Sequence, residues 1–400
     1  MNKNDKEVFA VFTNNWLGVS ETFIFRQTFP LTKRGEVFVL TQNKKDSKIL
    51  HNKDFKPEVY LSKRSRLDLY IGIARRKLLL GRNLYSTSKF QNKIWEKALI
   101  KKKPKLLHAH YGTAGLAILN LTKKLSIPQI TTFHGNDASV LVKKEAYLRS
   151  LKELFNHSYI ITVSNFIRNR LISLGADPKK TFCHYIGTDL SSFKYVPRKL
   201  TLGEKIKLGE KIKFLQVSNF VEKKGHLYTV QAFANYLNHN SNAELIFGGD
   251  GILKSSIEAL VRNLGIEDKV QFLGAIGPQE VNDLMKTCDV FLHHSITGRN
   301  GSEEGIPTVL MEAMAVGINV VSTQHAGIPE LVVPNECGVL VREKDVEGYS
   351  DSLINLENID TRIFSENAYK RVSEFFDVKK QSDFLINLYD KVIADFYSRK

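Results

Sequence analysis

The sequence is poor in cysteine and has no long apolar run. Its three cysteines, Cys183, Cys288 and Cys337, are widely spaced and form no C-x-x-C pair. We therefore expect buried thiols in a reducing compartment rather than a disulfide framework or a cysteine zinc site. No stretch approaches the roughly 18 consecutive apolar residues of a membrane-spanning helix. The first residues lack the hydrophobic segment of a signal peptide. These absences predict a cytoplasmic protein.

Several catalytic motifs are also missing. The chain has no G-x-S-x-G elbow and no Walker loop, which argues against serine hydrolases and P-loop nucleotidases. The turn Gly248–Gly251 is too short for the G-x-G-x-x-G fingerprint, so a nicotinamide cofactor is not expected. No Asp-x-Asp pair is present to hold a metal-bound diphosphate. His108 and His110 share one face of a predicted strand, but no third ligand follows at a recognisable spacing, which favours a structural or acceptor-side role. We predict no metal and no cofactor.

Positive charge is concentrated in the first quarter of the chain. Residues 1–105 hold 24 lysines and arginines against 9 acidic residues, which accounts for nearly all of the net charge of +16. Leu67–Tyr85 and Lys93–Leu107 mix these cations with Leu, Ile, Tyr and Trp. That mixture suits helices lying on an anionic membrane surface. It also fits ordinary amphipathic helices packed on a sheet. No recognisable nucleic-acid module accompanies the charge, so we expect no nucleic-acid partner.

Short apolar runs alternate with helical patterns, which predicts an α/β fold with parallel sheets covered by helices. The first series of predicted strands comprises 7–12, 36–41, 106–110, 129–133 and 159–163. We expect a loop over 43–65 and helix over 66–103. In Asp189–Glu210 apolar residues no longer recur at a regular spacing, so this segment is predicted to be a linker. A second series follows, with strands at 213–218, 243–247, 270–273, 289–293 and 318–322.

The stretch Asp289–Val333 carries the clearest chemical signal. Glu304 and Glu312 lie eight positions apart around a Gly-Ile-Pro turn, and Pro307 suits the first turn of a helix. The backbone at the start of the helix would suit a diphosphate, because the helix end is positive and its first amides are free. The residues concerned are Gly305, Ile306, Pro307 and Thr308, of which all but the proline have an N–H group. Two carboxylates beside an anion site would instead accept hydrogen bonds from sugar hydroxyls. The pattern predicts a nucleotide-sugar site, although a solvated Glu304 and a surface Glu312 also fit the bare spacing.

The segment EGIPTVLMEAMAVGINVVST, followed by AGIPELV, resembles the donor-binding signature of retaining GT-B glycosyltransferases of family four. It is most similar to the exopolysaccharide branch of colanic acid and amylovoran transferases. Shorter matches are SETFI, HAHYG, FHGND and TVS. The resemblance implies two Rossmann-like, doubly wound domains facing across a cleft. These would be an acceptor-binding domain over 1–195 and a nucleotide-sugar-binding domain over 196–378, with a helix over 379–400 crossing back to the first.

The resemblance also implies an activity. It is the transfer of a hexose, with retention, from a nucleotide diphosphate sugar to a lipid-linked glycan of exopolysaccharide, capsule or O-antigen. A UDP-sugar is the favoured donor. The enzyme would be metal-independent and would lie on the inner face of the plasma membrane, which the basic first quarter would contact.

Residue roles follow from the same resemblance. Glu304 would hold a sugar hydroxyl, the amides of the turn that follows would hold sugar and phosphate, and Glu312 would bind the ribose. Lys224 would stabilise the departing diphosphate, although it also fits a solvated surface lysine. His134 would orient the sugar near its anomeric carbon. On the acceptor side we place Ser20, Glu21, His110 and Asp137.

One donor position departs from the family pattern. Asn219 stands where the family typically has an arginine that shares the diphosphate with Lys224. Lys223, or the helix amides after Glu304, would have to compensate for that charge. Asn219 leaves open a non-catalytic homologue acting as an interaction subunit. Another GT-B enzyme, such as a sugar-nucleotide epimerase or a soluble-acceptor transferase, also stays open.

Overall fold

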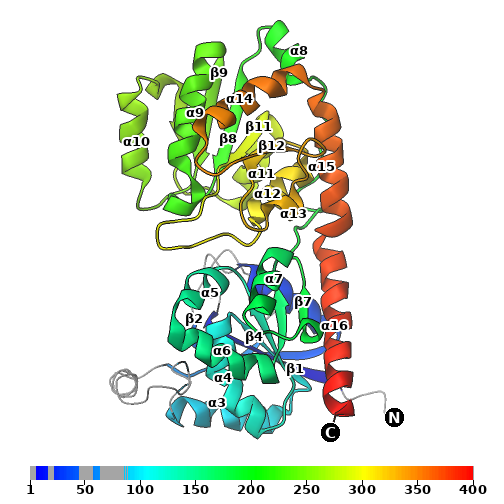
Figure 1. Ribbon diagram of the computed structural model, residues 1–400. Coiled ribbons are helices and arrows are strands. Elements are labelled where there is room, and N and C mark those ends of the chain that lie inside the picture. The colour runs from blue at the N-terminus through cyan, green and yellow to red at the C-terminus, as the bar shows by residue number, and fades with distance from the viewer. Residues whose placement is uncertain are drawn as a thin grey trace. The chain divides into compact units, whose positions relative to one another are not determined.

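A computed structural model describes residues 6–16, 22–44, 57–63, 85, 87 and 89–399. The chain divides into two compact units (Figure 1). The first unit comprises Met1–Ile186 and Gln381–Lys400, and the second comprises Gly187–Lys380. The boundaries expected from the sequence were after residues 195 and 378, whereas the units divide after Ile186 and Lys380.

The first unit is built on a parallel sheet, with seven strands among the described residues in the order β3-β2-β1-β4-β5-β6-β7. The strands are β1 (Glu7–Trp16), β2 (Gly35–Lys44), β3 (Glu58–Leu61), β4 (Leu106–His110), β5 (Gln129–Phe133), β6 (Tyr159–Thr162) and β7 (Thr181–Cys183). Every residue of β4, β5 and β6 is buried. These strands are buried on both faces because helices cover both sides of the sheet.

Helices cover that sheet on both sides. They are α1 (Thr22–Thr28), α3 (Lys89–Lys102), α4 (Gly112–Lys124), α5 (Asn136–Ser139), α6 (Glu145–His157), α7 (Asn165–Ser173) and the last part of α16 (Val378–Ser398), with short 3-10 turns at Phe29–Lys33, Leu141–Lys143 and Pro178–Lys180. Leu385, Leu388 and Tyr389 of α16 pack in one core with Phe9 and Val11 of β1. The C-terminal helix therefore returns to the first unit, as predicted (Figure 1).

The second unit has a parallel sheet of six described strands in the order β10-β9-β8-β11-β12-β13. These are β8 (Ile212–Val217), β9 (Ala243–Gly248), β10 (Val270–Phe272), β11 (Val290–His293), β12 (Asn319–Thr323) and β13 (Val339–Val341). The strand order reverses between β8 and β11. Doubly wound sheets bind ligands beyond the carboxyl ends of the strands at such a switch point.

The helices of the second unit are α8 (Leu202–Lys207), α9 (His226–His239), α10 (Lys254–Asn263), α11 (Pro278–Thr287), α12 (Thr308–Val316), α13 (Ile328–Leu331), α14 (Val346–Asn355) and α15 (Thr361–Phe375). Short 3-10 turns lie at η5 (Glu222–Lys224), Glu267–Lys269 and Leu356–Asn358. Pro307 is the N-cap of α12, and Gly317 ends that helix in the left-handed conformation. The helix thus begins one residue after Pro307, which the sequence analysis placed in its first turn.

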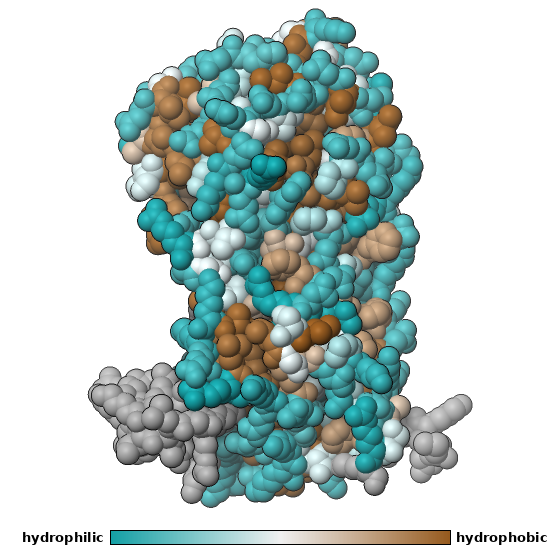
Figure 2. Space-filling model, in the orientation of Figure 1, coloured by the Kyte–Doolittle hydropathy of each residue, from teal (hydrophilic) through white to brown (hydrophobic). Residues whose placement is uncertain are grey.

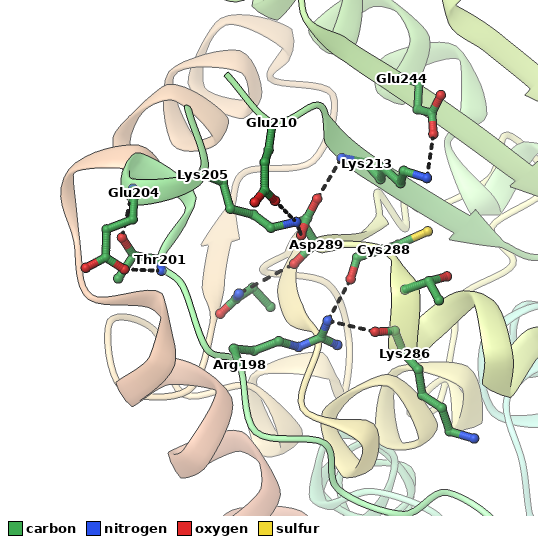
Figure 3. Close-up of polar contacts among 12 residues, drawn as sticks. Arg198, Thr201, Glu204, Lys205, Glu210, Lys213, Glu244, Lys286, Cys288 and Asp289 are labelled. Carbon is green, nitrogen blue, oxygen red and sulfur yellow. Dashed lines mark hydrogen bonds and ion pairs between the residues drawn. The ribbon is translucent and has the colours of Figure 1, made fainter. Parts of the chain in front are cut away.

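The start of the second unit is more ordered than the predicted linker. Arg198 donates from Nε to the carbonyl of Gly317 and from Nη2 to the carbonyl of Met285, each at 2.8 Å. Its Nη1 donates to the carbonyls of Lys286 at 3.2 Å and Cys288 at 2.8 Å (Figure 3). These carbonyls end α11 and α12, and carbonyls in the last turn of a helix lack intrahelical donors. One side chain therefore satisfies the C-terminal ends of two helices.

Three sequence-based expectations are wrong. Part of the supposed linker forms α8, whose capping box joins Thr201 and Glu204. The loop expected over 43–65 contains β3. The Lys93–Leu107 segment does not turn its aromatic face to lipid, because Trp95 and Leu99 are at most 1% exposed and pack on the sheet. The apolar face of that helix packs on the sheet instead. Leu67–Leu84 of the other basic segment, and Ser20 and Glu21, lie outside the described residues.

On the face of the molecule drawn in Figure 2, apolar residues are interspersed with polar ones. Within the described part of the chain, no helix has the length and apolar character needed to cross a membrane. Cys183, Cys288 and Cys337 are free thiols, of which Cys288 and Cys337 are buried and Cys183 is half-buried.

Candidate functional site

Two loops meet at the switch point of the second unit, one after β8 and one after β11. Gly225, at the end of the first loop, has φ +62° and is the N-cap of α9. A Cβ atom on Gly225 would lie 1.8 Å from the carbonyl oxygen of His294 in the second loop. Ile296 N also donates to the carbonyl of Lys223 at 3.0 Å. The glycine thus permits a backbone contact that places Lys223 and Lys224 beside the loop that carries Glu304.

Glu304 is a buried carboxylate held between two lysines. Lys224 Nζ lies 2.9 Å and Lys223 Nζ 3.2 Å from Glu304 Oε1, and the residue is 9% exposed. Burial by itself would raise the pKa of Glu304, but Lys224 and Lys223 more than offset it and hold that pKa well below its usual range. Glu304 is therefore ionised and is not a solvated surface residue. The three side chains together carry one net positive charge.

The residues that follow Glu304 lead into α12. Gly305, Ile306 and Pro307 are buried, and Thr308 begins α12. The first amides of a helix lack intrahelical acceptors, so this turn presents N–H groups and the positive end of the helix dipole. Glu312 is half-buried in α12, four residues after Thr308. Asn219 is exposed at the start of the β8 loop.

A histidine and a carboxylate that the sequence analysis missed fix the Glu304 loop. Glu304 N donates to His325 Nε2 at 3.1 Å, and His325 Nδ1 lies 2.6 Å from Glu343 Oε1. His325 stands beside the AGIPEL motif, which was a usable signal. Glu343 lies 18 residues further on, just beyond β13, and no spacing rule links it to Glu304.

The first unit gathers His110, His134 and Asp137 at the ends of β4 and β5. Asp137 Oδ1 accepts from the amides of His134 and Gly135, each at 3.0 Å, and Oδ2 accepts from Gly112 N at 2.9 Å. Burial raises the pKa of Asp137 although these three amides act in the opposite sense. Asp137 is 2% exposed and fixes the turn that presents His134.

His108, His110 and His134 of the first unit are stacked, and burial keeps them neutral. The rings of His108 and His110 lie 4.3 Å apart, which confirms that they share one face, and His110 Nδ1 lies 3.4 Å from His134 Nε2. Burial lowers the pKa of His110 to about 3 and that of His134 well below its ordinary value. Among the residues that the structure describes, no group of His, Cys, Asp and Glu is arranged to hold a metal ion. The predicted Ser20 and Glu21 lie outside those residues.

Comparison with known proteins gives a consistent result. Residues 201–371 match the family model described as Glycosyl transferases group 1, and residues 31–192 match that described as Glycosyltransferase Family 4. The chain is 32% identical over 256 residues to the colanic acid biosynthesis glycosyltransferase WcaL of Salmonella typhimurium, covering 63% of this chain and 61% of WcaL. The match thus spans about three fifths of the length of that relative.

A second relative is matched over more of its length. The chain is 30% identical over 300 residues to the N-acetyl-alpha-D-glucosaminyl L-malate synthase of Bacillus anthracis, covering 72% of this chain and 74% of the synthase. Among solved structures, Anabaena Alr3699/HepE in complex with UDP-glucose superposes with a TM-score of 0.75 at 19% identity, covering 96% of this chain and 99% of HepE. That superposition shows a shared fold.

Proposed function

Because the chain belongs to the group 1, family 4 glycosyltransferases of GT-B fold, we propose that it is a retaining hexosyltransferase. Its donor would be a nucleotide diphosphate sugar, with a UDP-sugar favoured. Its acceptor would be a lipid-linked glycan in the synthesis of a cell-surface polysaccharide. The name of the relative WcaL and the UDP-glucose in the HepE complex support this choice of substrates.

The observation that carries the proposal is the Glu304, Lys223 and Lys224 cluster at the switch point. A buried carboxylate flanked by two ammonium groups leaves one positive charge for an anionic ligand. Lys224 would stabilise negative charge on the departing diphosphate, a form of electrostatic catalysis that depends on donors fixed in advance. Lys223 would supply the second charge that Asn219 lacks. Glu304 would keep a free oxygen for a sugar hydroxyl.

The remaining predicted residues have assigned parts in the same proposal. The amides of Gly305, Ile306 and Thr308 would hold sugar and phosphate oxygens, and Glu312 would bind the ribose hydroxyls. Neutral His134 would orient the sugar near the reacting carbon. The departing diphosphate would take the proton of the acceptor hydroxyl, so the reaction would need neither a protein nucleophile nor a metal ion.

Contact with an anionic membrane is proposed from the charge of the first unit. Lys93, Lys97 and Lys101 on α3 and the following Lys103 and Lys105 are exposed. Clusters of exposed lysines are attracted to anionic lipid. A protein acting on a lipid-linked acceptor from the inner face of the plasma membrane would use such a surface.

The first test is a thermal-shift screen against UDP-sugars and GDP-sugars. A ligand that binds only the folded state at 100 times its Kd adds about 2.7 kcal/mol of stability, which gives a readily measured shift. A shift with UDP-sugars alone would support the proposed donor. Binding without hydrolysis or transfer would instead favour the interaction-subunit function, and sugar conversion without an acceptor would favour an epimerase.

The second test removes the carboxylate. We expect Glu304→Ala to lower kcat/KM for donor turnover by about 10²- to 10³-fold, because a preorganised polar contact in the site is lost. Glu336→Ala is the control, since Glu336 is an exposed glutamate of the same unit. A folded Glu304→Ala variant with full kcat/KM would rule out the proposed site.

A further inference from the structure

Glu343 is connected to both ends of the loop that carries Glu304. At the start of the loop, Thr297 N donates to Glu343 Oε2 at 2.8 Å. At its end, Glu304 N donates to His325 Nε2 at 3.1 Å, and His325 Nδ1 lies 2.6 Å from Glu343 Oε1. One carboxylate thus closes the loop, directly at Thr297 and through the imidazole at Glu304.

The segment that carries His325 is held in a conformation that few residues adopt. Ala326 has φ +47°, in the left-handed region that costs a non-glycine residue free energy. The next residue, Gly327, donates from its amide to the carbonyl of Gly305 at 3.1 Å. His325 itself is 1% exposed. Backbone strain of this kind persists where surrounding contacts fix it, and here those contacts lead to Glu304 and Gly305.

The hydrogen bonds require one particular form of His325. A backbone amide can only donate, so Nε2 must be an unprotonated acceptor toward Glu304 N. The proton of the neutral ring must then be on Nδ1, which donates to Glu343. A doubly protonated ring, or the Nε2–H tautomer, would direct an N–H against the Glu304 amide. Glu343 therefore selects the tautomer that holds the Glu304 backbone.

We propose that His325, with its tautomer set by Glu343, is the positioning residue for Glu304. The inference rests on the proposed function, because Glu304 is the residue placed against the sugar. His325 has its two ring nitrogens occupied by Glu304 N and Glu343, so it acts through Glu304 rather than on substrate. The diphosphate contacts are assigned to Lys224 and to the α12 amides rather than to this pair.

The activity test compares three variants with a matched control. The donors to be tried are UDP-glucose, UDP-galactose, UDP-N-acetylglucosamine and GDP-mannose, and kcat for hydrolysis or transfer is measured with the one that the protein turns over. We expect His325→Leu to lower this kcat by about 10- to 100-fold, because small displacements of a site group have effects of that size. The donor KM should change little, since the phosphate contacts remain. His325→Gln should recover most of the loss, because its amide oxygen can accept from Glu304 N.

Glu343→Gln separates tautomer control from packing. A glutamine offers one acceptor oxygen, while Thr297 N–H and the His325 Nδ1–H both require one. With the oxygen toward Thr297, the amide nitrogen donates to Nδ1 and forces the Nε2–H tautomer. We therefore expect this nearly isosteric variant to lose kcat as His325→Leu does.

The control is His239→Leu. His239 Nε2 makes a similar pair with Glu357 at 3.0 Å in the same unit. It ends α9, about 20 Å along the helix from Lys224. Its removal should leave kcat unchanged. Full kcat in folded His325→Leu, an equal loss in His325→Gln, or an equal loss in His239→Leu would each overturn the proposal.

A measurement without substrate distinguishes this proposal from the proposed function. Nitrogen-15 NMR of the imidazoles, with the His325 signals assigned by their loss in His325→Gln, should show a neutral ring protonated at Nδ1 at pH 7. In Glu343→Gln the proton should move to Nε2, and exchange of the Glu304 amide hydrogen should accelerate. An Nε2–H or doubly protonated wild-type ring would overturn the proposal. Absence of donor binding and turnover in the wild type, with the expected NMR result, would overturn only the function.

Discussion

Gly225 shows how much the candidate site depends on one residue without a side chain. Its φ of +62° is unfavourable for other residues, and its Cα faces the carbonyl oxygen of His294. The contact joins the loops after β8 and β11 and so places Lys224 beside Glu304. The two requirements, conformation and space, can be separated because Gly265 has φ +64° with no atom within 4 Å of an added Cβ.

We expect Gly225→Ala to be far more destabilising than Gly265→Ala. Gly265→Ala should lower the free energy of unfolding only by the cost of a left-handed backbone at a non-glycine residue, about 1 to 2 kcal/mol. Gly225→Ala adds a collision with the carbonyl of His294 and should lower the free energy of unfolding by about 3 kcal/mol or more, as overpacking against rigid groups does. Urea unfolding at pH 7 measures both values. Equal losses in the two variants would show that the contact with His294 is unimportant.

Individual site residues differed in how far the sequence could predict them. Glu304 was placed after β11 by its position before a Gly-Ile-Pro helix start. Its burial between Lys223 and Lys224 could not be predicted, since it depends on two loops from strands that are neighbours only in the folded sheet. His325 and Glu343 were missed for the same reason. Their link to Glu304 is tertiary and follows no sequence period.

At the scale of elements, Arg198 joins two helices that end on the same side of the second unit. Its guanidinium, which is flat and has five donors, matches four carbonyl oxygens at the ends of α11 and α12. A lysine has three donors on one atom and cannot reach carbonyls in this arrangement. The α12 end matters for function because the other end of this helix begins at the proposed donor site.

We expect Arg198→Lys to lower the free energy of unfolding by about 2 to 4 kcal/mol. The variant leaves buried carbonyls without donors, each at a cost of about 1 to 3 kcal/mol, and the ammonium recovers part of the loss. Arg342→Lys is the control because Arg342 is exposed. Chemical unfolding that gave the same midpoint for both variants would contradict this role for Arg198.

Elements with a strong sequence pattern were predicted well, and short ones were not. β4 and β5 have the bounds read from the sequence, because each is a short buried run ended by a polar turn. α8 has only six residues, and its T-x-x-E capping box at Thr201–Glu204 was a signal that was overlooked. β3 has four residues at the edge of its sheet, with mixed burial, and gives no clear period.

At the scale of the whole molecule, buried histidines make stability depend on pH. Burial lowers the pKa of four histidines to values that the unfolded chain does not share, about 3 for His110 and His226 and about 4 for His184 and His294. The unfolded histidines bind protons near pH 6.5. Between pH 6.5 and about 4, the unfolded state therefore holds more protons than the folded state.

Stability should therefore rise with pH from 4 to 6.5 and level off above it. Each neutral buried histidine contributes a slope of up to about 1.4 kcal/mol per pH unit in that window. Asp137, whose pKa burial raises, acts in the opposite sense but is a single group. We expect the urea midpoint to decrease from pH 7 to pH 6 and again to pH 5. His184→Gln, in the first unit, should reduce this dependence of stability on pH. A midpoint that rose on acidification would contradict the burial of these rings as neutral groups.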